Sequence, residues 1–325
     1  VAGSFAIAAR TFRRGGHDGG ERTDRDIPMS AILAGVVVSA LAVADIFELG
    51  KRFYHVKPRV EAASLVPMPG AADFLSRQNG PFRIFPAERA AFGSNAFGLK
   101  GLESIGGYHP AKLRSYQDLL GADLITSPGV LRMLNTRYVL APSELDWPTA
   151  PLHREGGLVY EFEDALPRAW AVRRIERVPD QATMLARLGS ETFDPAEVAL
   201  VYASAPDLPT GDRFAPADVT VTGYGTGRLS LEVEAPEQSF VVISEMAYPP
   251  GWRVRIDGRD VRAARVNHVL MGIGVPAGRS RIELEFHSGA AARGRGISRA
   301  AAAATVLLAG AGFLLNRKRR PAADA

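Results

Sequence analysis

The chain has 325 residues, a formal net charge of +4, 46% hydrophobic residues and 23% charged residues, a composition that excludes a disordered chain. It contains no cysteine, which excludes a disulfide framework and a thiolate metal site. Arginines cluster beside apolar blocks, so we interpret the positive charge as a signal that orients the chain in a membrane. We expect no nucleic acid partner.

The chain opens with the apolar run "VAGSFAIAA", residues 1–9, rather than with methionine. We interpret this run as the end of a truncated transmembrane helix, which makes the chain a fragment or an incomplete gene model. Residues 10–26 are polar and rich in arginine, and we expect them to form a cytoplasmic loop.

Residues 27–47, "IPMSAILAGVVVSALAVADIF", are apolar over about the length that crosses a bilayer and predict a transmembrane helix. A cleaved signal peptide is the alternative, because Ala42-Val43-Ala44 has the small-residue pattern of a cleavage site. Under both interpretations the residues that follow are exported.

Residues 55–205 mix helical and strand patterns. "FRIFP" (82–86) is typical of a strand, "PAKLRSYQDLLG" (110–121) of an amphipathic helix, and "SPGVLRMLNTRYVLA" (127–141) of a capped helix that leads into a strand. The pattern predicts an extracytoplasmic α+β domain.

Residues 215–290 alternate apolar and polar positions, with turn residues every 8 to 12 positions, and predict a small antiparallel β-sandwich. Asp257-Gly258 indicates a two-residue hairpin turn, because both residues accept a positive φ. The glycine-rich run at 223–227 joins two strands and precedes no helix, so we interpret it as a hairpin loop rather than a phosphate loop.

Residues 297–315 form a second apolar block, which we expect to be a transmembrane helix, and residues 316–325 begin a basic cytoplasmic tail. Basic residues lie before the first block and after the second, which predicts a cytoplasmic location for both. The fold class is therefore α+β: an exported mixed domain and a β-sandwich, flanked by transmembrane helices. We expect a multi-pass protein of the bacterial inner membrane whose main domain is extracytoplasmic and whose partner is the lipid bilayer.

Little catalytic chemistry is visible in the sequence. The six histidines are scattered without ligand spacing, so we predict no metal site and no cofactor, and the catalytic residues are unknown. Two acidic clusters, 144–146 and 161–164, have the residue type for acid–base catalysis, but their setting favours a solvated surface.

Three aromatic residues are the candidate ligand-binding residues. Tyr108 and His109 lie in the loop "GGYHP", which glycine and proline hold away from a core. Trp252 in "YPPGWRVRIDG" shares a strand face with Val254 and Ile256, which favours burial over a stacking platform.

The order of motifs resembles the C-terminal region of bacterial YfhO-type membrane proteins. The resemblance lies in a Tyr-Pro-Gly-Trp strand, an Asp-Gly hairpin, an asparagine-containing strand and a Pro-Ala-Gly turn, here Tyr248, Pro249 or Pro250, Gly251, Trp252, Asp257, Gly258, Asn267, Pro276, Ala277 and Gly278. Upstream, "GYHP", "LNTRYVLA" and "ALPRAW" also resemble that family, through Asn135, Arg137, Tyr138, Pro167 and Arg168. The chain departs from the pattern in its double proline and in the strand ending "EFHSG".

The resemblance implies a polytopic protein similar to GT-C glycosyltransferases, which transfer sugar from a lipid-linked donor outside the membrane. The implied partners are a polyprenyl-phosphate-linked sugar and a cell-envelope glycan acceptor. Enzyme activity rests on this resemblance alone, since the family's catalytic acidic residue belongs to an N-terminal loop and is not assigned to any position here. The alternative is a non-enzymatic, membrane-anchored module that binds or scaffolds envelope glycans.

Overall fold

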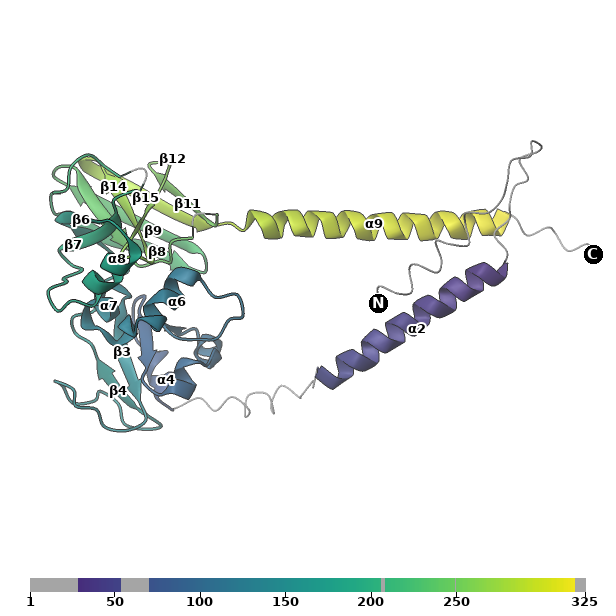
Figure 1. The fold of residues 1–325 in the computed structure, drawn as a ribbon, viewed down its shortest axis with the longest axis horizontal. Coiled ribbons are helices and arrows are strands. Elements are labelled where there is room, and N and C mark those ends of the chain that lie inside the picture. Colours follow the sequence, from purple (N-terminus) through teal and green to yellow (C-terminus); the bar gives the residue numbers. More distant parts are fainter. Residues whose placement is uncertain (1–28, 54–69, 206–207, 249, 319–325) are drawn as a thin grey trace, which may run out of the picture. The chain divides into compact units, whose positions relative to one another are not determined.

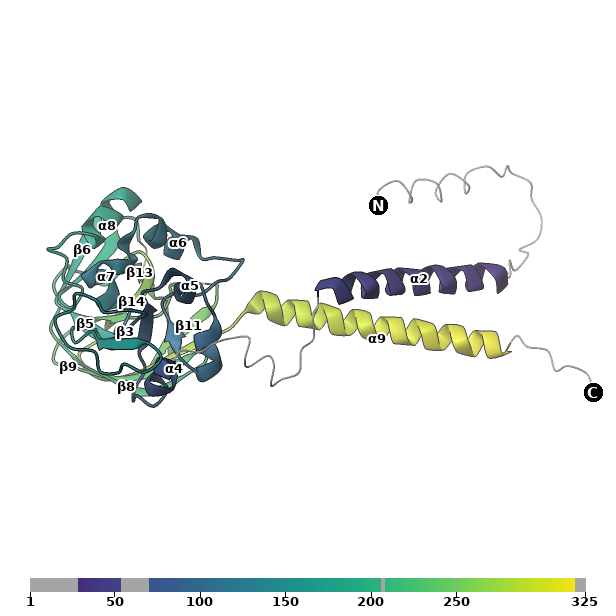
Figure 2. The same cartoon turned by 90° about the horizontal axis from the view of Figure 1, so that it is seen from below.

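The computed structural model describes residues 29–53, 70–205, 208–248 and 250–318, drawn as a ribbon in Figures 1 and 2. The chain divides into the units Val1–Val66 and Pro67–Ala325. The first unit contains helix α2 (Met29–Phe53), and the second contains all the strands and ends with helix α9 (Gly289–Lys318). The expected segments 1–9 and 10–26, and most of the basic tail, lie outside the described residues.

The two segments expected to be transmembrane are helical in the structure, in α2 and α9, but their crossing of a membrane is not shown. In the described part of the chain, no helix has both the length and the apolar character needed to cross a membrane. The transmembrane assignment of 27–47 and 297–315 is therefore not confirmed. Charged residues lie within both helices: Lys51 and Glu48 form an ion pair of 2.9 Å in α2, and α9 includes Arg293 near its start.

The second unit begins with a four-stranded sheet in the order β2-β1-β3-β4. Its strands are β1 (Arg83–Pro86), β2 (Glu103–Ser104), β3 (Thr136–Ala141) and β4 (Leu158–Glu161). The short helices α4 (Gly70–Leu75) and α5 (Arg89–Phe92) and the 3-10 helix η1 (Ala96–Lys100) accompany this sheet. Strand β1 pairs in parallel with both of its neighbours, β2 and β3. Local sequence patterns do not specify which strands pair or in which direction.

Three further helices lie in this unit: α6 (Arg114–Gly121), α7 (Pro128–Met133) and α8 (Gln181–Leu188), with the 3-10 helix η2 (Leu124–Thr126) between the first two. Asp180 caps α8, since its carboxylate accepts a hydrogen bond of 2.8 Å from the Thr183 amide. Helix α7 ends at Met133, and Asn135, with a positive φ of 58°, then turns the chain into β3, as the helix-to-strand pattern predicts.

A six-stranded sheet has the order β5-β10-β14-β13-β7-β6. Its strands are β5 (Ala169–Val172), β6 (Arg174–Val178), β7 (Val198–Tyr202), β10 (Ser239–Ile243), β13 (Ala264–Val266) and β14 (Leu270–Val275). The regions expected as an α+β domain (55–205) and as a β-sandwich (215–290) thus share this one sheet.

A five-stranded antiparallel sheet has the order β12-β11-β15-β9-β8. Its strands are β8 (Asp218–Gly225), β9 (Arg228–Ala235), β11 (Trp252–Ile256), β12 (Arg259–Val261) and β15 (Gly278–Phe286). Both predicted hairpins are confirmed. Asp257 and Gly258 have φ values of 50° and 77° between β11 and β12, and the glycine-rich run joins β8 to β9.

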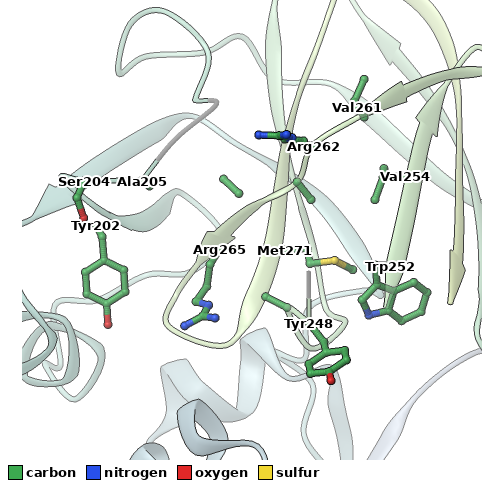
Figure 3. A pocket seen from close by; sticks show the side chains of 13 residues that line it. Tyr202, Ser204, Ala205, Tyr248, Trp252, Val254, Val261, Arg262, Arg265 and Met271 are labelled. Carbon is green, nitrogen blue, oxygen red and sulfur yellow. The ribbon is translucent and has the colours of Figure 1, made fainter. Parts of the chain in front are cut away.

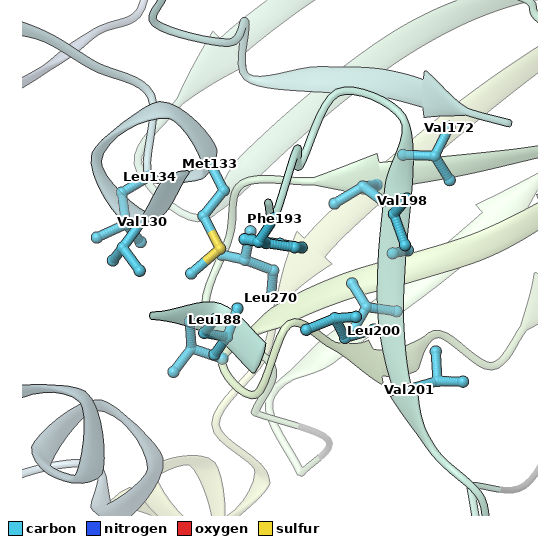
Figure 4. Close-up of a cluster of buried hydrophobic side chains, with 14 of the residues drawn as sticks. Val130, Met133, Leu134, Val172, Leu188, Phe193, Val198, Leu200, Val201 and Leu270 are labelled. Atoms are coloured by element: carbon cyan, nitrogen blue, oxygen red, sulfur yellow. The ribbon is translucent and has the colours of Figure 1, made fainter. Parts of the chain in front are cut away.

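Strand β10 belongs to two hydrophobic cores because alternate side chains of a strand point to opposite faces. Phe240 and Val242 lie in a core with the helices α6, α7 and α8, part of which Figure 4 shows. Val241 and Ile243 face a second core, between the six-stranded and the five-stranded sheets. The predicted α+β fold class is confirmed, and the described sheets are mostly antiparallel.

Candidate functional site

Tyr108 and His109 line a cavity of about 590 Å³, here called the loop pocket. The loop that carries them forms one wall, and helix α6 contributes Tyr116, Gln117 and Leu120. The pocket therefore combines exposed aromatic and polar side chains, which is the setting in which ligands are oriented on a protein surface.

The loop is held in place by Asn95. Its side-chain amide donates a 2.7 Å hydrogen bond to the Tyr108 carbonyl oxygen, and its carbonyl oxygen accepts a 2.9 Å bond from the Tyr108 amide. Gly107 has a φ of 110°, and a β-carbon on Gly106 would collide with the Phe92 carbonyl oxygen. Both glycines are therefore required for the loop to pass so close to α5.

The side chains of the loop are free to meet a ligand. Tyr108 is 62% exposed, and the Lys112 ammonium lies 5.7 Å from the centre of its ring. His109 Nδ1 lies 3.1 Å from both the amide nitrogen and the carbonyl oxygen of Ala111, and the residue is exposed. The pocket thus offers a ring face, a cation and an imidazole.

Tyr116 supports this wall from inside. Its hydroxyl donates to the Ile105 carbonyl oxygen, and burial raises the pKa of the phenol above its usual range. Tyr116 is therefore protonated at physiological pH and acts as a fixed donor that ties α6 to the loop.

Trp252 lies in a different cavity, of about 540 Å³, here called the sandwich pocket (Figure 3). Its indole N–H donates a 3.1 Å bond to the Met246 carbonyl oxygen, and its ring packs edge-on against Phe286 at 5.2 Å. Val254 and Ile256 on the same strand face are buried, as predicted. Trp252 is half-buried, so it packs against the core and also lines a cavity.

The structure brings Tyr108 and His109 together but places Trp252 apart from them. One segment of the chain borders both cavities, because Met246 lines the loop pocket and the next residue, Ala247, lines the sandwich pocket.

A partly buried charge cluster, which we define as Arg83, Arg168, Glu103 and Glu245, adjoins the loop pocket through Arg83. Arg168 has a fully buried side chain, with contacts of 3.0 Å to Glu103 and 3.4 Å to Glu245. Arg83 pairs with the same two carboxylates at 3.3 and 3.5 Å and also lines the loop pocket.

Tyr224 from β8 completes the cluster. The Arg168 guanidinium lies 4.7 Å from the centre of its ring, and its hydroxyl donates to Glu103. Burial raises the pKa of Glu245, although the two arginines oppose this shift. Sequence reasoning missed the cluster; its one signal is the "ALPRAW" motif, where an arginine sits beside an apolar strand.

The two acidic clusters lie on the solvent-accessible surface. Glu144 pairs with Arg154 at 2.9 Å and Glu161 pairs with Arg137 at 3.0 Å, both in solvent-accessible positions. Among the residues that the structure describes, no group of three potential ligands is arranged to hold a metal ion.

The fold and its cavities define an α+β protein with a β-sandwich that presents aromatic and polar side chains in two surface cavities. Residues 212–298 match the family model described as "Bacterial membrane protein YfhO", the family that the motifs of the chain resemble. The match covers the five-stranded sheet, strands β10, β13 and β14, and the start of α9. No curated protein and no solved structure matches the chain.

Proposed function

We propose that this region of a YfhO-type membrane protein binds a saccharide chain in the loop pocket. The observation that carries the proposal is the exposed Tyr108 ring, which Asn95 holds rigidly beside Lys112 and His109. A ring face stacks on the C–H face of a sugar, while the ammonium and imidazole donors suit its hydroxyl or acidic oxygens. A preorganised ring loses little conformational freedom when it binds.

In the intact protein, the bound saccharide is an envelope glycan that accepts sugar from a polyprenyl-phosphate-linked donor. The match of residues 212–298 to the YfhO family model and the resemblance to GT-C glycosyltransferases support this part of the proposal. The region then faces the outside of the inner membrane, which the basic residues before α2 and after the apolar part of α9 favour. The catalytic group is not assigned to any residue described here.

The test is isothermal titration calorimetry of the full chain in lipid nanodiscs with soluble envelope polysaccharide fragments. Tyr108→Ala is expected to weaken binding by about tenfold, which corresponds to about 1.4 kcal/mol. Leu152→Ala is the matched control, because Leu152 is 51% exposed and does not line the pocket. Equal affinities of Tyr108→Ala and the parent chain would refute the proposal.

A sugar-transfer assay on membranes separates the enzymatic role from the non-enzymatic one. If the glycan is a substrate, Tyr108→Ala lowers transfer while the amount of protein in the membrane stays constant. Saturable binding with no transfer by the parent protein would instead support the scaffolding module.

A further inference from the structure

The turn between β13 and β14 contains an unusual histidine. Asn267 and His268 have φ values of 48° and 67°, in the left-handed region that favours glycine. Asn267 fixes the turn on β7, since its side-chain oxygen accepts a 2.8 Å bond from the Leu200 amide. The turn itself does not require an imidazole, so the role of His268 lies in what its ring contacts.

Both nitrogens of the His268 ring are occupied. Nδ1 lies 2.7 Å from the Tyr202 hydroxyl oxygen and Nε2 lies 3.1 Å from Asp118 Oδ2, and the residue is only 2% exposed. An ionised carboxylate can only accept, so Nε2 carries the proton and donates it to Asp118. Nδ1 is then bare and accepts the Tyr202 hydroxyl proton.

This arrangement fixes the character of Tyr202 at neutral pH. Burial lowers the pKa of His268 below its usual value, against the opposing effect of Asp118, so the ring is neutral. The Tyr202 hydroxyl donates its proton to His268 Nδ1, so toward any further partner the Tyr202 oxygen can only accept a hydrogen bond. Tyr202 lines the sandwich pocket, so that partner would come from this cavity.

The charged groups that line the sandwich pocket are cationic. They are Arg262 and Arg265, and no carboxylate is among its described lining residues. Within the described part of the chain, the Arg265 side chain forms no hydrogen bond or ion pair, and Figure 3 shows it between the side chains of Tyr202 and Tyr248. Tyr248 is 42% exposed and is supported from behind by stacking on Phe286 at 6.1 Å.

We propose that the sandwich pocket is a second binding site, specific for an anionic saccharide. The acidic group pairs with Arg265, a sugar hydroxyl donates to the Tyr202 oxygen, and the sugar ring lies against Tyr248. His268 and Asp118 are positioning residues that keep Tyr202 an acceptor. This site goes beyond the proposed function, because none of these residues lines the loop pocket.

The proposal makes binding depend on pH. When His268 is protonated, its Nδ1–H donates to the Tyr202 oxygen, and the phenolic proton must turn toward the cavity. The acceptor becomes a donor, and the sugar hydroxyl loses its partner. The groups that face His268 and Tyr202 are Asp118 from α6, Arg265 from β13 and Asp180 at the start of α8.

The experiment is calorimetric titration of the full chain in nanodiscs with glucuronate and with glucose 1-phosphate; methyl glucoside and inorganic phosphate are the comparison ligands. At least one acidic sugar is expected to bind saturably, and at least tenfold more tightly than either comparison ligand. Tyr202→Phe and Arg265→Met, which preserve side-chain size, should each weaken binding by about tenfold. Leu152→Ala, at an exposed residue that lines neither pocket, should leave binding unchanged.

The pH profile tests the positioning residues. Affinity in the parent chain should fall as the pH drops through the pKa of His268, which burial places below the usual value of histidine. His268→Gln should abolish this dependence. If that variant does not fold, Asp118→Asn provides the test, because loss of the carboxylate charge lowers the pKa of His268 further and moves the transition to lower pH.

Three outcomes would overturn the proposal. They are no binding of either acidic sugar, equal affinity for inorganic phosphate, and affinity for the acidic sugar that is unchanged by Tyr202→Phe.

Discussion

Replacing Arg168 with methionine is expected to lower the free energy of unfolding by about 3–5 kcal/mol, the usual cost of removing one partner from a buried ion pair. The side chain is completely buried and contacts carboxylates from two places in the fold, Glu103 of β2 and Glu245 after β10. Without the Arg168 guanidinium, the largely buried Glu245 carboxylate keeps only Arg83 as a positively charged neighbour in the cluster. Arg83 retains contacts with both carboxylates, so we expect the lower end of this range.

The matched control is Arg253→Met. Arg253 forms two hydrogen bonds to Asp260, of 2.7 and 2.8 Å, but both residues are exposed. Such pairs contribute about 1 kcal/mol or less, because water already solvates both charges. Denaturant unfolding of the full chain measures both variants. Similar small losses for the two arginines would show that the buried cluster does not hold the three sheets together.

Phe240→Ala is expected to destabilise the protein by about 3–5 kcal/mol, which combines lost burial with the cavity left behind. Phe240 is fully buried in the core that contains residues of α6, α7 and α8, and its ring also covers Gly272 of the neighbouring strand. Val241, the next residue, lies in the other core. Because β10 contributes side chains to both cores, loss of the Phe240 ring should destabilise both cores together.

Tryptophan fluorescence can test this coupling. Trp170 lies in the first core and Trp252 contacts the second, so variants that keep only one of the three tryptophans, either Trp170 or Trp252, report on each core separately. Both reporters should show the same transition midpoint, and Phe240→Ala should shift both equally. Tyr224→Phe, at the exposed rim of the charge cluster, is the mild control. Two separate midpoints, only one of them shifted, would refute shared cooperativity.

The sequence by itself determined the local features. Alternation of apolar and polar residues determined which face of β11 is buried, so Val254 and Ile256 lie inside as predicted. Turn chemistry determined the Asp257-Gly258 hairpin, because few residues accept a positive φ. The order of these motifs also indicated the YfhO family, which the match over 212–298 confirms.

Candidate residues were predicted only where the signal was local. Tyr108 and His109 share a short Gly/Pro-bounded loop, and they do line one cavity. Trp252 was correctly placed on a buried strand face, but the sequence did not reveal that it also borders a second cavity.

Only the tertiary structure decided which distant groups meet. Tyr202 and His268 are 66 positions apart, and His268 and Asp118 are 150 apart, yet they form one chain of hydrogen bonds. Arg168 and Glu245 likewise meet across 77 positions. Periodicity fixes the face of a strand but not its neighbours in the sheet, because pairing depends on how whole elements pack. The sites that depend on such pairings therefore required the folded structure.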